Sequence, residues 1–258
     1  PPGVALRARA PAAREAAIHA EPAIAGPEPI LALNPWPTAI GGDFAYSFDP
    51  EWVTVTPSHV ATERTYVEFE GQTAYGNRSR FPFYARSADW QESDRLLAGI
   101  ITAFGSPTSV IAVGGHGEFR GTMLESFSDP RIEGNFSAEA LRAWDVVWGR
   151  TRGHLLIQDG YVDVTDGVAT EGRSEIRANG RFSLGYPRRD GGEEIDARIV
   201  ARDRPLRDLR HAFELDDWPL EGRLSGEFHL SGKYTRPFGF GRLVIDDMTA
   251  WSEPFDTA

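Results

Sequence analysis

The sequence predicts a mostly β protein, an antiparallel sheet made from two repeats that each carry one short amphipathic helix. Two observations lead to this prediction. From Phe44 onward, apolar and polar residues alternate over short segments that Gly and Pro separate, and such alternation is typical of half-buried strands. In addition, short phrases recur in one order at a nearly constant distance, which indicates an internal duplication.

The duplication extends well beyond the four-residue phrase VATE, which begins at Val60 and again at Val168. WVTVT from Trp52 is matched by YVDVT from Tyr161, 109 positions later. The same offset relates three further pairs: Gly71 and Gly180, Gly76 and Gly185, and the phrase GEF at Gly117 and at Gly226. These matches predict a first repeat at 44–150 and a second at 151–258, after a Pro- and Ala-rich linker or extension at 1–43.

One helix is expected inside each repeat, between a group of strands and the phrase GEF. The segment 87–105 has apolar residues three, four and seven apart, and Ser87 or Asp89 is placed to cap its start. Its counterpart lies within 204–216, where Leu206, Leu209 and Phe213 have helical spacing. A helix with one apolar stripe buries that stripe against the sheet.

Composition excludes several classes of function. The formal net charge is −11 and the isoelectric point about 5.1, without the clustered Lys and Arg that nucleic-acid binding requires. The chain has no Cys, so it has no thiolate metal site, disulfide or Cys nucleophile. It also lacks an apolar run long enough to cross a membrane as a helix.

No catalytic or cofactor motif stands out, and we therefore expect neither enzymatic activity nor a cofactor. The phosphate-loop and nucleophile-elbow patterns are absent, and the acidic pairs fall where turns are expected. The six histidines are scattered; His116 and Glu118 come nearest to a metal-ligand pair, yet the matching GEF phrase, with Leu224 two positions ahead of Gly226, has no histidine before it. We expect no metal site.

Two longer segments resemble the recurring phrase of TamB and AsmA-like envelope proteins. PLEGRLSGEFHLSGKYTRPFGFGRLVIDDMTAWSEPF runs from Pro219 to Phe255, and a looser copy, IAVGGHGEFRGTMLESFSDPRIEGNFSAEALRAWDVV, runs from Ile111 to Val147. Each combines glycine-containing alternating strands with a Pro-Gly turn. The resemblance covers roughly 44–258, and the Pro- and Ala-rich start departs from it.

The resemblance implies a segment of a much longer protein that is anchored in the inner membrane of a diderm bacterium and spans the periplasm. It implies an elongated, folded-over antiparallel sheet, a β-taco or solenoid-like groove with an apolar interior. The implied role is binding or conducting phospholipid between the inner and outer membranes, in support of outer-membrane assembly. The implied partners are phospholipid acyl chains and an Omp85-family outer-membrane protein bound through another part of the parent chain.

The candidate groove lining is the set of apolar residues that are in phase along the expected strands. An open groove would leave this apolar strip to acyl chains, whereas a structural or adhesion module, a β-sandwich or solenoid with a closed core, would bury it under its own side chains. A right-handed β-helix enzyme would need shorter coils and converging carboxylates. The candidate residues are Val53, Val55, Val67, Phe69, Phe119, Ile132, Phe136, Val162, Val164, Ile176, Phe182, Phe228, Leu230, Leu243 and Ile245.

Overall fold

The protein is mostly β in the part of the chain that its structure, a computed structural model, describes. The described residues are 4–9, 40–75, 78–103, 110, 112–143, 146–183, 194–212, 216–233, 236–251 and 253–257. Contacts divide the chain into unit 1, residues 1–110 and 116–134, and unit 2, residues 111–115 and 135–258. These units are therefore not the same segments as the sequence repeats 44–150 and 151–258.

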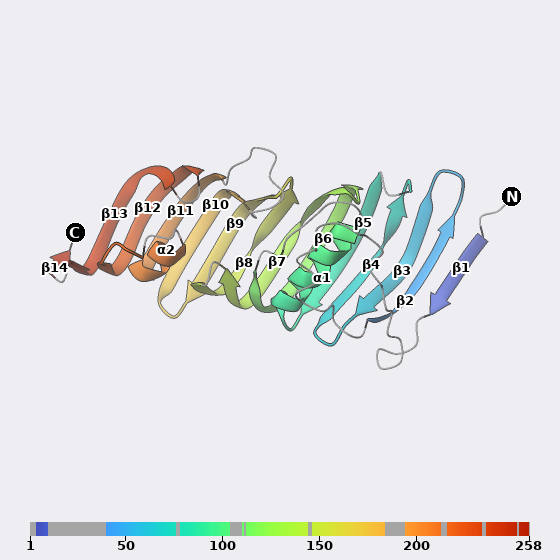
Figure 1. The fold of residues 1–258 in the computed structure, drawn as a ribbon, viewed down its shortest axis with the longest axis horizontal. Helices are drawn as coiled ribbons and strands as arrows, with labels where there is room; N and C mark the ends of the chain where they lie inside the picture. Colours follow the sequence, from blue (N-terminus) through green and yellow to red (C-terminus); the bar gives the residue numbers. More distant parts are fainter. Residues whose placement is uncertain are drawn as a thin grey trace. The chain divides into compact units, whose positions relative to one another are not determined.

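Unit 1 is an antiparallel sheet whose neighbouring strands are consecutive in the chain (Figure 1). One helix, α1, lies between its fifth and sixth strands in sequence. The elements are β1 (Val4–Arg9), β2 (Gly41–Phe48), β3 (Val53–Ala61), β4 (Thr65–Thr73), β5 (Ser79–Ser87), α1 (Trp90–Ala103), β6 (Gly114–Ser126) and the first part of β7 (Asp129–Ala143).

Unit 2 repeats this plan, with antiparallel pairing from β8 through to β14 in chain order. Its helix α2 again precedes the strand that carries GEF. The elements are β8 (Val146–Gln158), β9 (Tyr161–Glu171), β10 (Ser174–Ser183), β11 (Glu194–Pro205), α2 (Leu206–Ala212), β12 (Leu220–Lys233), β13 (Arg236–Ala250) and β14 (Glu253–Thr257). The predicted antiparallel β class, with two short helices, is confirmed.

The two repeats share a β-bulge, which supports the duplication at the level of backbone geometry. In β3 the register shifts between Val55, opposite Gly71, and Ser58. In β9 it shifts between Val164, opposite Gly180, and Gly167, so that each of these positions is 109 residues from its counterpart. A bulge adds a residue to one strand and bends it. Its presence at the same place in both copies therefore supports an internal duplication.

The phrase VATE is not equivalent in the two repeats, although it is identical in sequence. Val60 pairs with Val67 across β3 and β4, whereas Val168 pairs with Arg177 across β9 and β10. Since Val67 and Arg177 lie on opposite faces of their sheets, the two phrases are one residue out of phase. A one-residue slip turns every side chain to the other face, and the bulge and glycine positions therefore define the repeat.

Both predicted helices are present, within the predicted segments. Asp89 caps α1: its Oδ1 accepts a hydrogen bond from the Gln91 N–H at 3.0 Å, and its carbonyl accepts one from the Glu92 N–H. Ser87 supports this cap because its Oγ accepts a hydrogen bond from the Asp89 N–H at 3.1 Å. Helix α2 follows Pro205, whose fixed φ suits a helix start.

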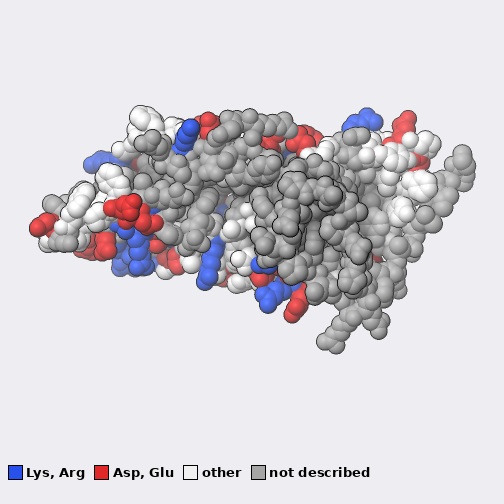
Figure 2. All heavy atoms as spheres, in the orientation of Figure 1, with Lys and Arg blue, Asp and Glu red and all other residues white. Residues whose placement is uncertain are grey.

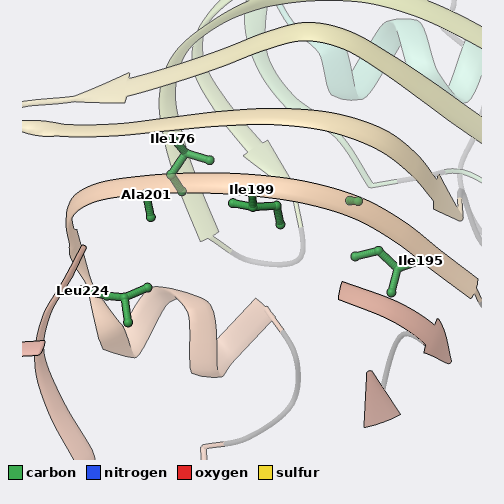
Figure 3. Packing of buried hydrophobic residues seen from close by; sticks show 6 residues of the cluster. Ile176, Ile195, Ile199, Ala201 and Leu224 are labelled. Carbon is green, nitrogen blue, oxygen red and sulfur yellow. The ribbon is translucent and has the colours of Figure 1, made fainter. Parts of the chain in front are cut away.

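The hydrophobic core of unit 2 lies between the sheet and α2. Its buried residues come from β10, β11 and β12, and Leu206 of α2 packs against them. Figure 3 shows Ile199 and Ala201 projecting from β11 toward the side on which α2 lies. The cluster is Ile176, Ile195, Ala197, Ile199, Ala201 and Leu224.

The predicted linker or extension at 1–43 is described only in part. Val4–Arg9 forms β1, which pairs with β2 from Val4 opposite Phe48 to Arg9 opposite Asp43. Residues 1–3 and 10–39 lie outside the described residues.

Candidate functional site

One face of the unit 2 sheet is apolar, and its composition follows from the strand register. In an antiparallel ladder, directly opposed residues project from the same face. Phe182 is opposed by Val162 on one side and by Ile195 on the other, and the alternation extends this face across the neighbouring strands. Eight of the predicted lining residues share it: Val162, Val164, Ile176, Phe182, Phe228, Leu230, Leu243 and Ile245.

A ninth predicted residue, Phe136 of β7, lies against β8. Its ring Cε1 would be 3.4 Å from a Cβ added at Gly153. Gly153 lies between Arg152 and His154, where the β8–β9 register shifts, so the ring covers backbone at this irregularity.

Unit 1 has an apolar face that follows the same rule. Phe69 is opposed by Phe83, and Ala85 by Phe119, while Val53, Val55 and Val67 follow by alternation and pairing across β3 and β4. Ile132 of β7 is buried at 8% exposure. The structure therefore places Val53, Val55, Val67, Phe69 and Phe119 on one face of unit 1.

Sequence reasoning missed several aromatic residues of the unit 1 face. Phe48 is opposed by Val53, and the Phe44 ring lies 6.2 Å from that of Phe69. Both are exposed, at 37% for Phe44 and 43% for Phe48. Phe81 and Phe83 alternate in phase on β5; the alternation around Pro82 would have revealed them.

The opposite face of unit 2 carries a ladder of ion pairs over β9 to β12, and two exposed residues of β13, Phe238 and Phe240, also project from it. Arg181 donates to Asp163 through two nitrogens at 2.8 and 2.7 Å, and this hydrogen bond raises the pKa of the arginine. Further pairs on the exposed strands join Arg198 to Glu227 and Arg177 to Glu175. Exposed pairs contribute little stability, but they make the part of this face over β9 to β12 unsuitable for apolar ligands.

A charged cleft of about 660 Å³ lies in unit 2 beside α2. Its walls come from the start of β8, the turn between β9 and β10, the end of β11, α2 and β12. Figure 2 shows acidic and basic side chains gathered together at the end of unit 2 that carries α2. The lining residues are Val146, Val147, Glu171, Gly172, Arg173, Ser174, Pro205, Arg207, Asp208, Asp216 and Arg223.

Arg204 anchors α2 beside this cleft and is only 1% exposed. Its Nη2 donates to the Val147 carbonyl at 2.9 Å and lies 3.1 Å from Asp208 Oδ2, while its Nη1 lies 3.3 Å from Glu171 Oε2. Its guanidinium also stacks 5.1 Å from the Trp148 ring centre. A buried charge needs such partners, so Arg204 ties β8, β9 and α2 together.

Asp203 holds two arginines at the rim of the cleft. Arg223 donates to its carboxylate, and Arg173 Nε lies 3.0 Å from its Oδ2. The hydrogen bond from Arg223, more than any other contact, lowers the pKa of the Asp203 carboxyl. The carboxylate therefore keeps its charge and holds both guanidinium groups in place.

His116 and Glu118 are the pair that most resembles a metal-ligand motif in the sequence. In the structure, the glutamate is hydrogen-bonded to a tyrosine. Glu118 accepts a hydrogen bond from the Tyr84 hydroxyl at 2.7 Å, and this bond raises the pKa of the Tyr84 phenol. Across the described residues, no group of three His, Asp or Glu side chains is placed to hold a metal ion.

The described helices are too short or too polar to span a membrane. Comparisons with models of protein families, with curated proteins and with solved structures found no match to the chain.

Proposed function

We propose that this protein is a segment of an envelope protein whose apolar sheet face binds or conducts phospholipid acyl chains between inner and outer membranes. The observation that carries the proposal is the contrast between the two faces of each sheet. One face is apolar, with incompletely covered residues such as Phe48 and Leu243, the latter 47% exposed. The other carries ion pairs such as Arg181 with Asp163.

The proposed movement of acyl chains along the apolar face is passive. Burying a methylene group stabilises by about 0.8 kcal/mol, and similar apolar side chains on successive strands offer an acyl chain near-equivalent positions. Movement along such a surface breaks no hydrogen bond or ion pair. The sheet would fold over the lipid as a β-taco, which the resemblance to TamB and AsmA-like proteins supports.

The same resemblance supports a place in the periplasm of a diderm bacterium, with the membrane anchor in another part of the parent chain. It also supports an Omp85-family outer-membrane partner bound elsewhere on that chain. Under this proposal the protein has no catalytic role, and its contribution to outer-membrane assembly is lipid supply.

Native mass spectrometry of the chain purified from bacterial envelope tests the proposal. Phospholipid is expected to copurify, and Leu243→Glu is expected to reduce its occupancy at least tenfold because a carboxylate would face the acyl chain. Val244→Glu is the matched control: Val244 is the next residue of β13, projects from the polar face and is 38% exposed.

Acidic substitutions deeper in the face, Val164→Asp and Phe228→Glu, are expected to have the same effect, with Val168→Asp as their control on the polar face. Circular dichroism verifies that each variant is folded. A folded wild-type protein free of lipid would refute the proposal and favour the structural or adhesion module with a closed core.

A further inference from the structure

We propose that the cleft beside α2 binds the zwitterionic headgroup of a phospholipid, a phosphate ester joined to an ammonium group. This inference rests on the proposed lipid-binding function and adds the class of headgroup. The cleft volume of about 660 Å³ lies within the roughly 300–1,000 Å³ typical of ligand sites. Three features support the assignment: an unsatisfied buried hydroxyl, a balanced set of charges, and contact with the apolar face.

The buried hydroxyl is that of Ser174, which lines the cleft and is 3% exposed. Its Oγ has no hydrogen-bond partner in the described structure. The equivalent residue of the first repeat, Thr65, is 109 positions earlier and has its Oγ1 2.8 Å from Ser93 Oγ of α1. Helix α2 has no Ser or Thr, so the hydroxyl that α1 satisfies in unit 1 is left for a ligand in unit 2.

The charges of the cleft are balanced. Its lining holds three arginines and three carboxylates. Arginine is suited to phosphate because its planar group donates two parallel hydrogen bonds, and carboxylates are suited to an ammonium group. A purely anionic headgroup would lie against the carboxylates, so the balance favours a ligand with both charges. The residues are Arg173, Arg207, Arg223, Glu171, Asp208 and Asp216.

The cleft adjoins the apolar face of unit 2. Ser174 and Glu171 oppose each other across β9 and β10, in phase with Ile176 of the core cluster. Val146, Val147 and Pro205 add apolar wall to the cleft. A headgroup in the cleft would therefore have its acyl chains on the apolar side of the sheet, away from the ion-pair ladder.

Native mass spectrometry of the 258-residue chain tests this inference, using equimolar phosphatidylethanolamine and phosphatidylglycerol with identical acyl chains. The wild-type protein is expected to prefer phosphatidylethanolamine about tenfold. Arg173→Gln with Arg207→Gln is expected to lower its occupancy about tenfold, because both side chains are exposed and can be changed without loss of the fold. Arg177→Gln with Arg202→Gln, on the polar face, is the matched control.

Two further variants separate binding from folding. Ser174→Ala is expected to weaken phosphatidylethanolamine binding by a factor on the order of ten, while the thermal midpoint of the lipid-free protein does not fall, because a buried hydroxyl without a partner costs stability. Asp216→Asn is expected to shift the preference toward phosphatidylglycerol by making the cleft net positive, and Asp217→Asn, next in the chain and outside the lining, is the control.

The outcomes distinguish the inference from the function on which it rests. Equal binding of both lipids by the wild type, unchanged in the variants, would overturn the headgroup site and leave the apolar lipid face standing. Absence of any bound lipid would overturn both. Free phosphoethanolamine serves as a separate probe: if it binds in the cleft while neither lipid does, the site is for a soluble phosphate ester and the lipid assignment is wrong.

Discussion

Gly71 and Gly180 are equivalent residues of the two repeats, and both have a backbone conformation that requires glycine. They have φ values of 147° and 139°, and a Cβ added to either would lie 2.1 or 2.2 Å from a carbonyl oxygen of the neighbouring strand. Each lies opposite the strand that carries the bulge. Only glycine tolerates this backbone without strain, so the pair marks the same local geometry in both copies.

We expect Gly180→Ala to lower the free energy of unfolding by about 3 kcal/mol, because it combines backbone strain with a steric clash. Gly172→Ala is the control: its φ is 57° and a Cβ there would meet nothing within 4 Å, so a loss of only about 1 kcal/mol is expected. Urea unfolding measures both. Equal losses would show that the close approach at Gly180 is unimportant.

Asp203 links stability to pH through its two arginines. Since its pKa is lowered in the folded protein, chiefly by Arg223, its contribution is present above the unfolded pKa of about 3.9 and is lost as pH falls through the folded pKa. Asp203→Asn should therefore lower the thermal midpoint at pH 7. The midpoints of the two proteins should converge as the pH falls below about 4.

Asparagine is a suitable replacement because Asp203 has a φ of 50°, a conformation that asparagine also adopts readily. A difference in thermal midpoint that persists unchanged at low pH would show that the charge of Asp203 is not its source.

At the scale of elements, the helices of the two repeats are held against their sheets by different contacts. The start of α1 is held by hydroxyl groups: Thr65 Oγ1 and Ser87 Oγ both lie within hydrogen-bond distance of Ser93 Oγ. Helix α2 has seven residues against fourteen in α1 and is held by the buried Arg204.

We expect Arg204→Ala to lower the free energy of unfolding by about 3 kcal/mol, because it removes a buried side chain that bonds the Val147 carbonyl and stacks on Trp148, and it leaves the partly buried Asp208 without its cation. Arg207→Ala is the control, since Arg207 also pairs with Asp208 but is 79% exposed, and a loss below about 1 kcal/mol is expected. Comparable losses would exclude a special role for the buried arginine.

At the scale of the molecule, residues 236–245 of β13 favour association of the 258-residue chain in solution. β14 pairs with residues from Asp246 to Ala250, and among described residues no strand pairs with the outer side of 236–245. Phe238 and Phe240 in this segment are 74% and 69% exposed. An exposed apolar strand edge is a template for pairing with another chain.

Replacing both phenylalanines, Phe238→Lys with Phe240→Lys, is expected to reduce self-association at least fivefold, because charged side chains on an edge oppose pairing. Sedimentation velocity at several protein concentrations measures this. The control is Tyr66→Lys, on the polar face of β4, which is paired on both sides. An equal reduction in the control would indicate a general effect of charge instead of an edge effect.

Much of the fold was predictable because local rules govern it. Alternation of Val53 with Val55 and of Val162 with Val164 requires strands, and the spacing of Leu206 with Leu209 favours a helix. The eight candidate residues of unit 2 share one face, since side chains alternate with a period of two between bulges. The phrase VATE is the exception: its two copies are 108 residues apart, whereas the bulge and the pairing on both sides of it keep an offset of 109, so the copies fall on opposite faces.

The charged cleft was not predictable, since its residues are spread from Val146 to Arg223 and share no motif. Arg204 and Glu171 are ordinary surface residues by sequence, and they meet because β9 and β11 pair with the two sides of β10, which brings the end of β11 close to the end of β9.

The sequence alone determined the antiparallel β class, the duplication, the position of both helices and the apolar phase of the strands, because periodicity and turn chemistry act over a few residues. The tertiary structure alone decided which apolar residues stay exposed, how Arg204 is buried and why Ser174 lacks a partner while Thr65 has one. These properties depend on the register between strands and on which side chains the packed helix presents to them, and both bring together residues that are distant in the chain.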